Sequence, residues 1–347
     1  MVYFWYPAAK PGDSIAPYLP GARQMDAIPE IHNRATQDFG KAWADIVSGA
    51  ISSHATERAP VAKGARGWPL VVFSHGLGST SFAYTHLIES LVSQGYVVAS
   101  IEHTHTAFAV WFPDGRVIPA HHESPPAELA GEKRSKWMME QISEGIAEGA
   151  ADIRFVLDRT LKMNADSKLF FLAGKMDLTT IAAMGHSAGA EYAARACQVD
   201  DRLKACVDLD GAMVPVAALP EYPDGATLKQ PLLFLEAYHP DSQTGGSASQ
   251  KEAYRTKKEQ QLQKCPSGTY NVVIRSPGIA HPSFSDIPLL FRGENGYPEP
   301  SVALHNLDLI EKFVREFLGK NLKHEKAPLL DGPTNQMPEA IVQPYGT

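Results

Sequence analysis

A serine flanked by glycines most constrains how this chain can fold. Residues 185–189 read GHSAG, which is the pattern G-x-S-x-G. They follow an apolar run at residues 180–184 that predicts a buried strand, and they lead into an alanine-rich run at residues 188–196 that predicts a helix. A chain that passes from strand to helix at one serine must turn sharply there, and the small neighbouring residues leave room for that turn.

The rest of the sequence predicts a mostly parallel central sheet flanked by helices. Short apolar runs alternate with longer segments of helical periodicity, which is typical of successive β-α-β units. We expect strands at residues 1–7, 70–73, 96–101, 180–184, 205–209, 232–235 and 271–274. We expect helices at residues 82–93, 136–161, 188–196 and 304–318.

A single domain is the most economical organisation for these 347 residues, because the chain contains no internal repeat. We expect this α/β domain to span residues 1–320. Residues of about 104–150 interrupt the strand-helix alternation and predict a cap-like insertion, in which a Pro-Asp-Gly turn at 113–115 forms a hairpin. Residues 321–347 are rich in proline and polar residues and predict an irregular tail.

Strand, turn and helix in this order predict the α/β-hydrolase fold, with Ser187 as a nucleophile exposed at the turn. The N-terminus of the following helix would bring its positive dipole end near a reacting carbonyl oxygen. The alternative is a glycine-rich packing turn in a noncatalytic protein of the same fold.

A second glycine-rich segment, residues 73–78 (FSHGLG), directly follows an expected central strand. Hydrolases of this fold place one backbone donor to the reaction's oxyanion there and the other just after the nucleophile. We therefore expect the N–H groups of Leu77 and Ala188 to be the two donors. The alternative is an ordinary strand-to-helix turn.

The general base should be a histidine late in the chain. His281 lies in the loop after the last expected strand, from which it can reach back over the serine. We predict it as the base, with structural or solvated roles for the other histidines after Ser187, which are His239, His305 and His324.

The acid that orients the base is not decided by sequence order. Asp210 ends the strand after the serine helix, and Glu236 ends the next strand. Both precede His281, and either carboxylate could hold an imidazole tautomer. Asp208 and Asp241 are weaker candidates.

Five motifs in one order resemble the platelet-activating factor acetylhydrolase family, of the plasma and type II intracellular kind. They are FSHGLG at 73–78, EH at 102–103, GHSAG at 185–189, LDGAM at 209–213 and HPSFSD at 281–286. The resemblance covers about residues 2–318.

This resemblance implies Ser187 as nucleophile, Asp210 as acid and His281 as base. It also implies Leu77 and Ala188 as oxyanion donors, so that Asp210 is favoured over Glu236. The expected activity is hydrolysis of short acyl esters without a cofactor, such as the sn-2 acyl group of PAF-like or oxidised phospholipids. A cutinase-like or general carboxylesterase and a noncatalytic binding protein of this fold are the alternatives.

Composition excludes several other classes. The net charge of −7 is spread along the chain without a Lys/Arg cluster, which argues against a nucleic-acid partner. No apolar run approaches the ~20 residues that span a bilayer. Three widely spaced cysteines form neither a disulfide framework nor a C-x-x-C site.

Histidines cluster after the third expected strand, at His103, His105, His121 and His122. No carboxylate spacing supports a metal site among them, and the resemblance implies no metal; we expect Glu102 and His103 to form a structural hydrogen bond instead.

No signal-like segment opens the chain, so a cytoplasmic protein and a secreted one whose signal has been removed are both compatible with it. The sequence does not specify an oligomeric state.

Overall fold

An eight-stranded sheet organises the computed structural model, which describes residues 1–64, 66–121, 123–168, 170–211, 228–238, 248–332 and 337–346. The strand order is β1-β5-β4-β8-β9-β10-β11-β12. The strands from β5 to β11 are parallel to their neighbours, and the two edge strands β1 and β12 are antiparallel. The mostly parallel sheet with flanking helices expected for the α/β-hydrolase fold is therefore confirmed.

The sheet strands have the following bounds: β1 (Val2–Trp5), β4 (Trp68–Ser74), β5 (Val97–Ile101), β8 (Met176–His186), β9 (Leu203–Leu209), β10 (Leu232–Ala237), β11 (Thr269–Ile274) and β12 (Ala340–Tyr345). The long helices are α4 (Thr85–Ser93), α5 (Gly131–Asn164), α6 (Ala188–Val199), α8 (Ala248–Gln263) and α10 (Pro300–Leu318). Each expected strand and helix has a counterpart, and the ends differ by a few residues. Within the part of the chain that the structure describes, no helix is long and apolar enough to cross a membrane.

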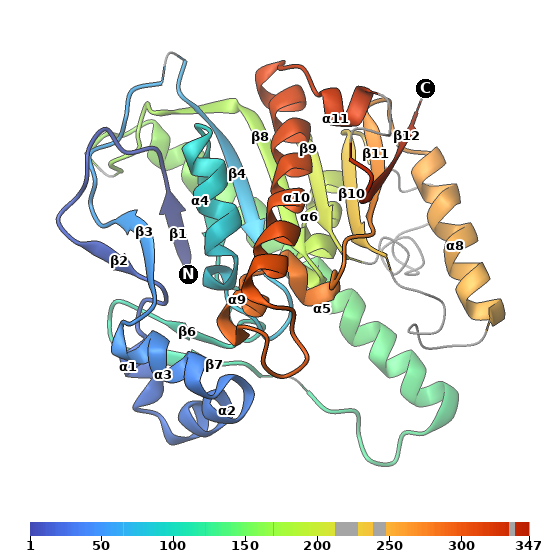
Figure 1. Ribbon diagram of the computed structural model, residues 1–347, viewed down its shortest axis with the longest axis horizontal. Helices are drawn as coiled ribbons and strands as arrows, with labels where there is room; N and C mark the ends of the chain where they lie inside the picture. The colour runs from blue at the N-terminus through green and yellow to red at the C-terminus, as the bar shows by residue number, and fades with distance from the viewer. Residues whose placement is uncertain are drawn as a thin grey trace.

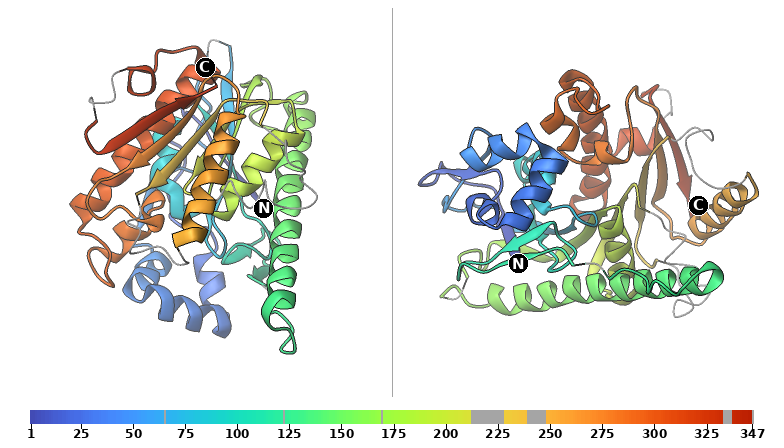
Figure 2. Two further views of the ribbon diagram at one scale, coloured as in Figure 1. Left: turned by 90° about the vertical axis from the view of Figure 1, so that its right-hand side faces the viewer. Right: turned by 90° about the horizontal axis from the view of Figure 1, so that it is seen from below.

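Helices cover both faces of the sheet (Figures 1 and 2). A hydrophobic core lies between the sheet and the helices on each face. Strand β4 shows how one sequence serves both. Val71 and Phe73 belong to the core under α4 and α10, whereas Leu70 and Val72 belong to the core under α5 and α6. This follows from the two-residue period of a strand, and all four side chains are fully buried.

An N-terminal layer that the strand and helix pattern did not predict lies at the same end of the molecule as the hairpin β6–β7 (Figure 1). It contains α1 (Ala22–Asp26), α2 (Pro29–Phe39), α3 (Lys41–Ser48) and the ribbon of β2 (Ile15–Pro17) and β3 (Ser52–Thr56). The expected hairpin forms as β6 (Ala109–Trp111) and β7 (Val117–Pro119). Phe108 at its base packs on Phe39 and Trp43, with ring centroids 6.0 Å apart in each pair. Aromatic contacts thus join the N-terminal helices to the insertion.

The C-terminal tail is more regular than its composition predicted. The irregular segment expected from residue 321 on contains η3 (Gly319–Lys323), α11 (Pro328–Asp331) and strand β12. Strand β12 pairs with β11 over six residues and buries Ala340 and Val342 while Ile341 is exposed. That alternation is short and ends at a proline, so the pattern was missed, and the prediction of an irregular tail is wrong for this strand.

The carboxyl end of β5 buries an acidic side chain, Glu102. Its Oε1 accepts hydrogen bonds from Thr80 Oγ1, Ser81 N–H and Ser81 Oγ. Its Oε2 has no hydrogen-bond partner among the described residues, and His75 Nε2 lies 4.0 Å from it. Burial raises the pKa of Glu102 to about 7, and the three hydrogen bonds oppose that rise.

We expect Glu102 to make stability fall with rising pH. Between about pH 4.5 and 7 the folded chain keeps a proton on Glu102 that the unfolded chain has released, so the free energy of unfolding decreases over this window. Glu102→Gln keeps an acceptor for Thr80 and Ser81 but cannot ionise. The free energy of unfolding of Glu102→Gln, measured by urea denaturation, should therefore rise relative to that of wild type by roughly 1–3 kcal/mol from pH 5 to pH 8.

Glu128→Gln, at an exposed position, is the matched control. Its free energy of unfolding should equal that of wild type at both pH 5 and pH 8. Equal pH slopes for wild type and Glu102→Gln would contradict the prediction.

Candidate active site

Ser187 lies at a strained turn between β8 and α6. Its backbone angles are φ 55° and ψ −125°, a conformation that non-glycine residues rarely adopt. The glycines on either side permit it. A Cβ at Gly185 would lie 2.1 Å from the Gly189 carbonyl oxygen, and one at Gly189 would lie 2.2 Å from the Ser74 carbonyl oxygen. The sequence GHSAG therefore forms the sharp strand-to-helix turn that its pattern predicts.

A carboxylate and a histidine meet beside this turn. Asp210 directly follows β9, and its Oδ2 lies 2.6 Å from Nδ1 of His281, the first residue of η2 (His281–Phe284). The other carboxylate oxygen accepts the Ala237 N–H at 2.8 Å. The carboxylate is almost fully buried, whereas about half of the His281 side chain is exposed. Such a pair can hold one imidazole tautomer and stabilise its protonated form.

The other candidate acid has different partners. Glu236 Oε1 lies 2.6 Å from Lys258 Nζ and accepts a 3.0 Å hydrogen bond from Asn271. Asp208 is fully buried beneath the turn, where it accepts the Gly211 N–H, and burial raises its pKa well above the usual range. The structure thus brings Asp210, rather than Glu236, to His281.

Of the other histidines after Ser187, the two that the structure describes have surroundings of their own. His305 pairs with Glu339 at 2.8 Å, and His324 is exposed after η3. His239 and Asp241 lie outside the described residues, as do positions 212–213 of the LDGAM motif.

His186 links the serine to the histidine. Its ring centroid lies 4.5 Å from that of His281, and its Nε2 lies 3.1 Å from the His281 carbonyl oxygen. On the other side of the turn, a Cβ at Gly76 would lie 3.3 Å from Ser187 Cβ. The loop after β4, the serine turn and the histidine loop therefore meet at one edge of the sheet.

The backbone around Gly76 is held in a defined orientation. The Gly76 carbonyl oxygen accepts from His75 Nδ1 at 2.8 Å and from the Ser79 N–H at 3.0 Å. The Leu77 N–H belongs to the same trans peptide and so points the opposite way. The Ala188 N–H opens helix α6, where the first amides have no acceptor within the helix. The two amides expected as oxyanion donors thus belong to constrained backbone beside Ser187.

His75 has one possible tautomer in this arrangement. Its Nε2 accepts the His103 N–H at 3.2 Å, so Nδ1 must carry the hydrogen that is donated to Gly76. Burial, together with the nearby His103, lowers the pKa of His75 to about 3, which keeps the ring neutral.

The expected hydrogen bond between Glu102 and His103 is replaced by other contacts. His103 Nδ1 lies 2.8 Å from Asp152 Oδ2 on α5, and its Nε2 lies 3.0 Å from Ser74 Oγ. The rings of His105 and His121 lie 6.4 Å apart, and His122 lies outside the described residues. These histidines therefore serve different contacts.

Three residues of the site were not identified as functional from the sequence. Tyr84 lies in an expected helix and His186 is the second residue of GHSAG, but both are buried beside the turn and resemble ordinary core residues. Arg34 of α2 lies over the Phe108 ring, and its Nη2 would lie 3.7 Å from a Cβ at Gly78. Arg34 belongs to the N-terminal layer that was not predicted, so no pattern could place it near residues 76–78.

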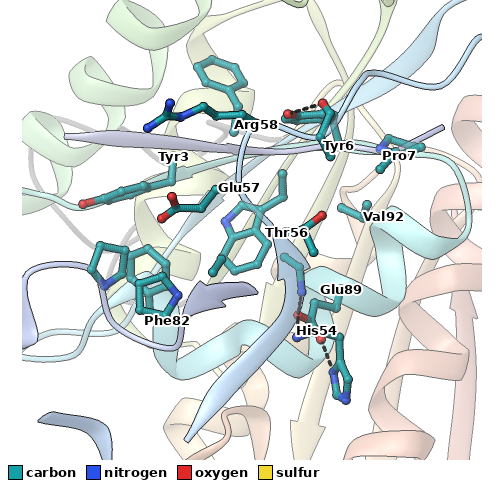
Figure 3. A pocket seen from close by; sticks show the side chains of 18 of the residues that line it. Tyr3, Tyr6, Pro7, His54, Thr56, Glu57, Arg58, Phe82, Glu89 and Val92 are labelled. Atoms are coloured by element: carbon teal, nitrogen blue, oxygen red, sulfur yellow. Dashed lines mark hydrogen bonds and ion pairs between the residues drawn. The ribbon is translucent and has the colours of Figure 1, made fainter. Parts of the chain in front are cut away.

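A separate cavity of about 640 Å³ lies between β1, β3 and α4 (Figure 3). Its wall is rich in aromatic residues, including Tyr3, Tyr6 and Phe82, and Glu89 is turned to His54 at 2.8 Å. None of Ser187, Asp210 and His281 lines this cavity. It is therefore distinct from the site at the serine turn.

The chain matches a family model over residues 1–295, and that model describes "Platelet-activating factor acetylhydrolase, isoform II". A platelet-activating factor acetylhydrolase from Cavia porcellus is 23% identical over 97% of this chain and 77% of its own length. The one from Gallus gallus is 24% identical over 64% of this chain, and the match spans 56% of that protein.

A fungal relative, a probable 1-alkyl-2-acetylglycerophosphocholine esterase from Arthroderma benhamiae, is 24% identical over 79% of this chain and 66% of its own length. Among solved structures, a ferulic acid esterase from Streptomyces cinnamoneus superposes with a TM-score of 0.69 at 24% identity, covering 99% of this chain and 88% of that one. The structural likeness supports the fold. On its sequence, the chain belongs to the platelet-activating factor acetylhydrolase isoform II family, a family of ester hydrolases.

Proposed function

We propose that the chain is a serine carboxylic-ester hydrolase with Ser187 as nucleophile, His281 as general base and Asp210 as the acid that orients it. The observation that carries the proposal is the strained Ser187 turn beside a 2.6 Å contact between Asp210 and His281. A packing turn needs neither a serine in a strained conformation nor a partly exposed histidine held by a buried carboxylate.

In the proposed reaction His281 takes the proton of the Ser187 hydroxyl as its oxygen attacks the ester carbonyl. The N–H groups of Leu77 and Ala188 stabilise the oxyanion that forms, and the protonated His281 gives its proton to the leaving alcohol. Water then attacks the acyl-serine with His281 as base, which releases the carboxylic acid and restores the serine. No cofactor enters this scheme.

The proposed substrates are short acyl esters, such as the sn-2 acyl group of PAF-like or oxidised phospholipids. The names of the relatives support this class. Arg34 adds a structural argument, since its guanidinium lies beside Gly78, one residue after the Leu77 amide. A substrate phosphate bound near the scissile ester would form an ion pair with the Arg34 guanidinium.

The first prediction concerns the nucleophile. A fluorophosphonate should add one phosphonyl group to wild type and none to Ser187→Ala, measured by intact mass. Esterase turnover of p-nitrophenyl butyrate should fall by about 10⁴-fold or more in the same variant. Ser135→Ala, on the exposed part of α5, is the matched control and should label normally. Wild-type turnover in Ser187→Ala, or a folded wild type that neither labels nor turns over, would contradict the proposal.

A second prediction separates the two carboxylates. Asp210→Asn should lower kcat by about 10²–10⁴-fold, because an amide at this position favours the wrong imidazole tautomer. Glu236→Gln should stay within a few-fold of wild type, since Glu236 pairs with Lys258 instead. Steady-state kinetics on p-nitrophenyl butyrate, with melting temperatures for both variants, decide the matter. The reverse ranking would make Glu236 the acid.

A third prediction tests the substrate class. For the short-chain phospholipid dibutyrylglycerophosphocholine, Arg34→Gln should raise KM by about 3–5-fold, the effect of one exposed ion pair. For dibutyrylglycerol, which lacks the phosphate, KM should not change. Arg116→Gln removes an exposed cation from the hairpin and is the control. Equal effects on both substrates would favour a general carboxylesterase without phosphate recognition.

A further inference from the structure

Two buried side chains outside the proposed triad connect the loop after β4 to the loop after β11. The Gly76 N–H donates to the Tyr84 hydroxyl oxygen at 3.1 Å, and this oxygen lies 2.7 Å from His186 Nδ1. His186 Nε2 lies 3.1 Å from the His281 carbonyl oxygen. Tyr84 is 1% exposed and His186 is 5% exposed.

The chemistry of the partners fixes the direction of each hydrogen bond. A backbone carbonyl can only accept, so His186 Nε2 carries the hydrogen. Burial, together with the nearby His281, lowers the pKa of His186 to about 3, so the neutral ring offers Nδ1 as an acceptor. The Tyr84 hydroxyl therefore donates to Nδ1 and accepts from Gly76. Burial raises the pKa of Tyr84 to about 12, so this hydroxyl keeps its proton at neutral pH.

We infer that Tyr84 and His186 are positioning residues that fix the oxyanion-donor loop relative to the catalytic base, an inference that rests on the proposed function. The hydrogen-bonded path from Gly76 through Tyr84 and His186 to the His281 carbonyl is called the Tyr84–His186 bridge below. As proposed, the bridge acts through the backbone of the two loops, which its hydrogen bonds reach at the Gly76 N–H and the His281 carbonyl.

The packing around the bridge leaves little freedom for the loops to move separately. A Cβ at Gly76 would lie 3.3 Å from both Ser187 Cβ and the Tyr84 hydroxyl oxygen. The Tyr84 ring packs on Phe73 of β4 with centroids 4.8 Å apart, and the His186 ring stacks on Phe284 at 5.8 Å and 15°. The Tyr84 ring is thus packed on β4, and its hydroxyl holds the loop that follows β4. The His186 ring is packed on η2, which begins with His281.

The neutral state of His186 also suits the proposed reaction. Its ring lies 4.5 Å from the ring of His281, which becomes cationic when it takes the serine proton. A second cation at that distance would oppose this step. In the neutral ring both nitrogens have partners, because Nδ1 accepts from the Tyr84 hydroxyl and Nε2–H donates to the His281 carbonyl.

The bridge is tested by Tyr84→Phe, which removes one oxygen and keeps the ring that packs on Phe73. We expect kcat for p-nitrophenyl butyrate to fall by about 10–100-fold, somewhat less than the loss of a whole oxyanion donor. KM should change less than about twofold. Inhibition by an alkyl trifluoromethyl ketone, whose adduct with serine resembles the tetrahedral oxyanion, should weaken by the same factor as kcat/KM.

Tyr96→Phe removes the hydroxyl of another buried tyrosine, directly before β5, and is the matched control that should leave kcat unchanged. A second pair of variants guards against loss of folding in the first. The amide of His186→Gln can still donate to the His281 carbonyl, whereas His186→Leu cannot. We expect His186→Gln to retain about tenfold more kcat than His186→Leu.

The outcomes distinguish failure of the Tyr84–His186 bridge from failure of the proposed function. Parallel losses of kcat/KM and trifluoromethyl ketone affinity, with unchanged melting temperature, support the bridge. An active wild type with an equally active Tyr84→Phe overturns the bridge alone. Lost activity with unchanged ketone affinity, or equal activity of the two His186 variants, assigns these residues a merely structural role and overturns it too. A folded wild type without turnover overturns the proposed function, and the inference with it.

Discussion

The backbone contact between the start of helix α6 and the end of strand β4 is the constraint on which the site depends. Gly189 approaches the Ser74 and His75 carbonyls so closely that a Cβ there would lie 2.2 Å and 2.5 Å from their oxygens. Because α6 begins against β4, Ser187 must turn with a positive φ, and the loop from Ser74 to Gly78 must pass directly beside it. Strain of this kind persists only where the surrounding structure determines it, and here two glycines and two parallel strands do so.

The order of strands then assigns roles that chain order leaves open. Strands β4, β8 and β9 are adjacent, so the loops after them meet at one edge of the sheet, whereas β10 stands between β9 and β11. The end of β10 braces the acid, because Asp210 N–H donates to the Leu235 carbonyl and Ala237 N–H donates to the Asp210 carboxylate. Glu236 lies between these two braces, and its own side chain is directed to Lys258 of α8.

These contacts explain which features the sequence could predict. The strand-turn-helix at Ser187, the strand order along the chain and the histidine after β11 follow from local patterns. The choice of Asp210 came only from resemblance, because Glu236 and Lys258 are 22 residues apart in the sequence and their pairing leaves no periodic pattern. The N-terminal helices were missed because glycines at 40 and 49 break them into short pieces. Tyr84 and His186 look like core residues until their partners, 102 residues apart in sequence, are seen together.

The burial of two neutral histidines beside one glycine bears on what the site is for. Burying an imidazole requires that both ring nitrogens find partners, and desolvation lowers the pKa of His75 and of His186 to about 3. One holds the Gly76 carbonyl, and the other holds the Gly76 N–H through the Tyr84 hydroxyl. A packing turn could be stabilised by apolar side chains at less cost in desolvation. Polar groups that hold both the N–H and the carbonyl of one residue, Gly76, favour a site in which the direction of the next amide matters, which is the requirement of an oxyanion donor.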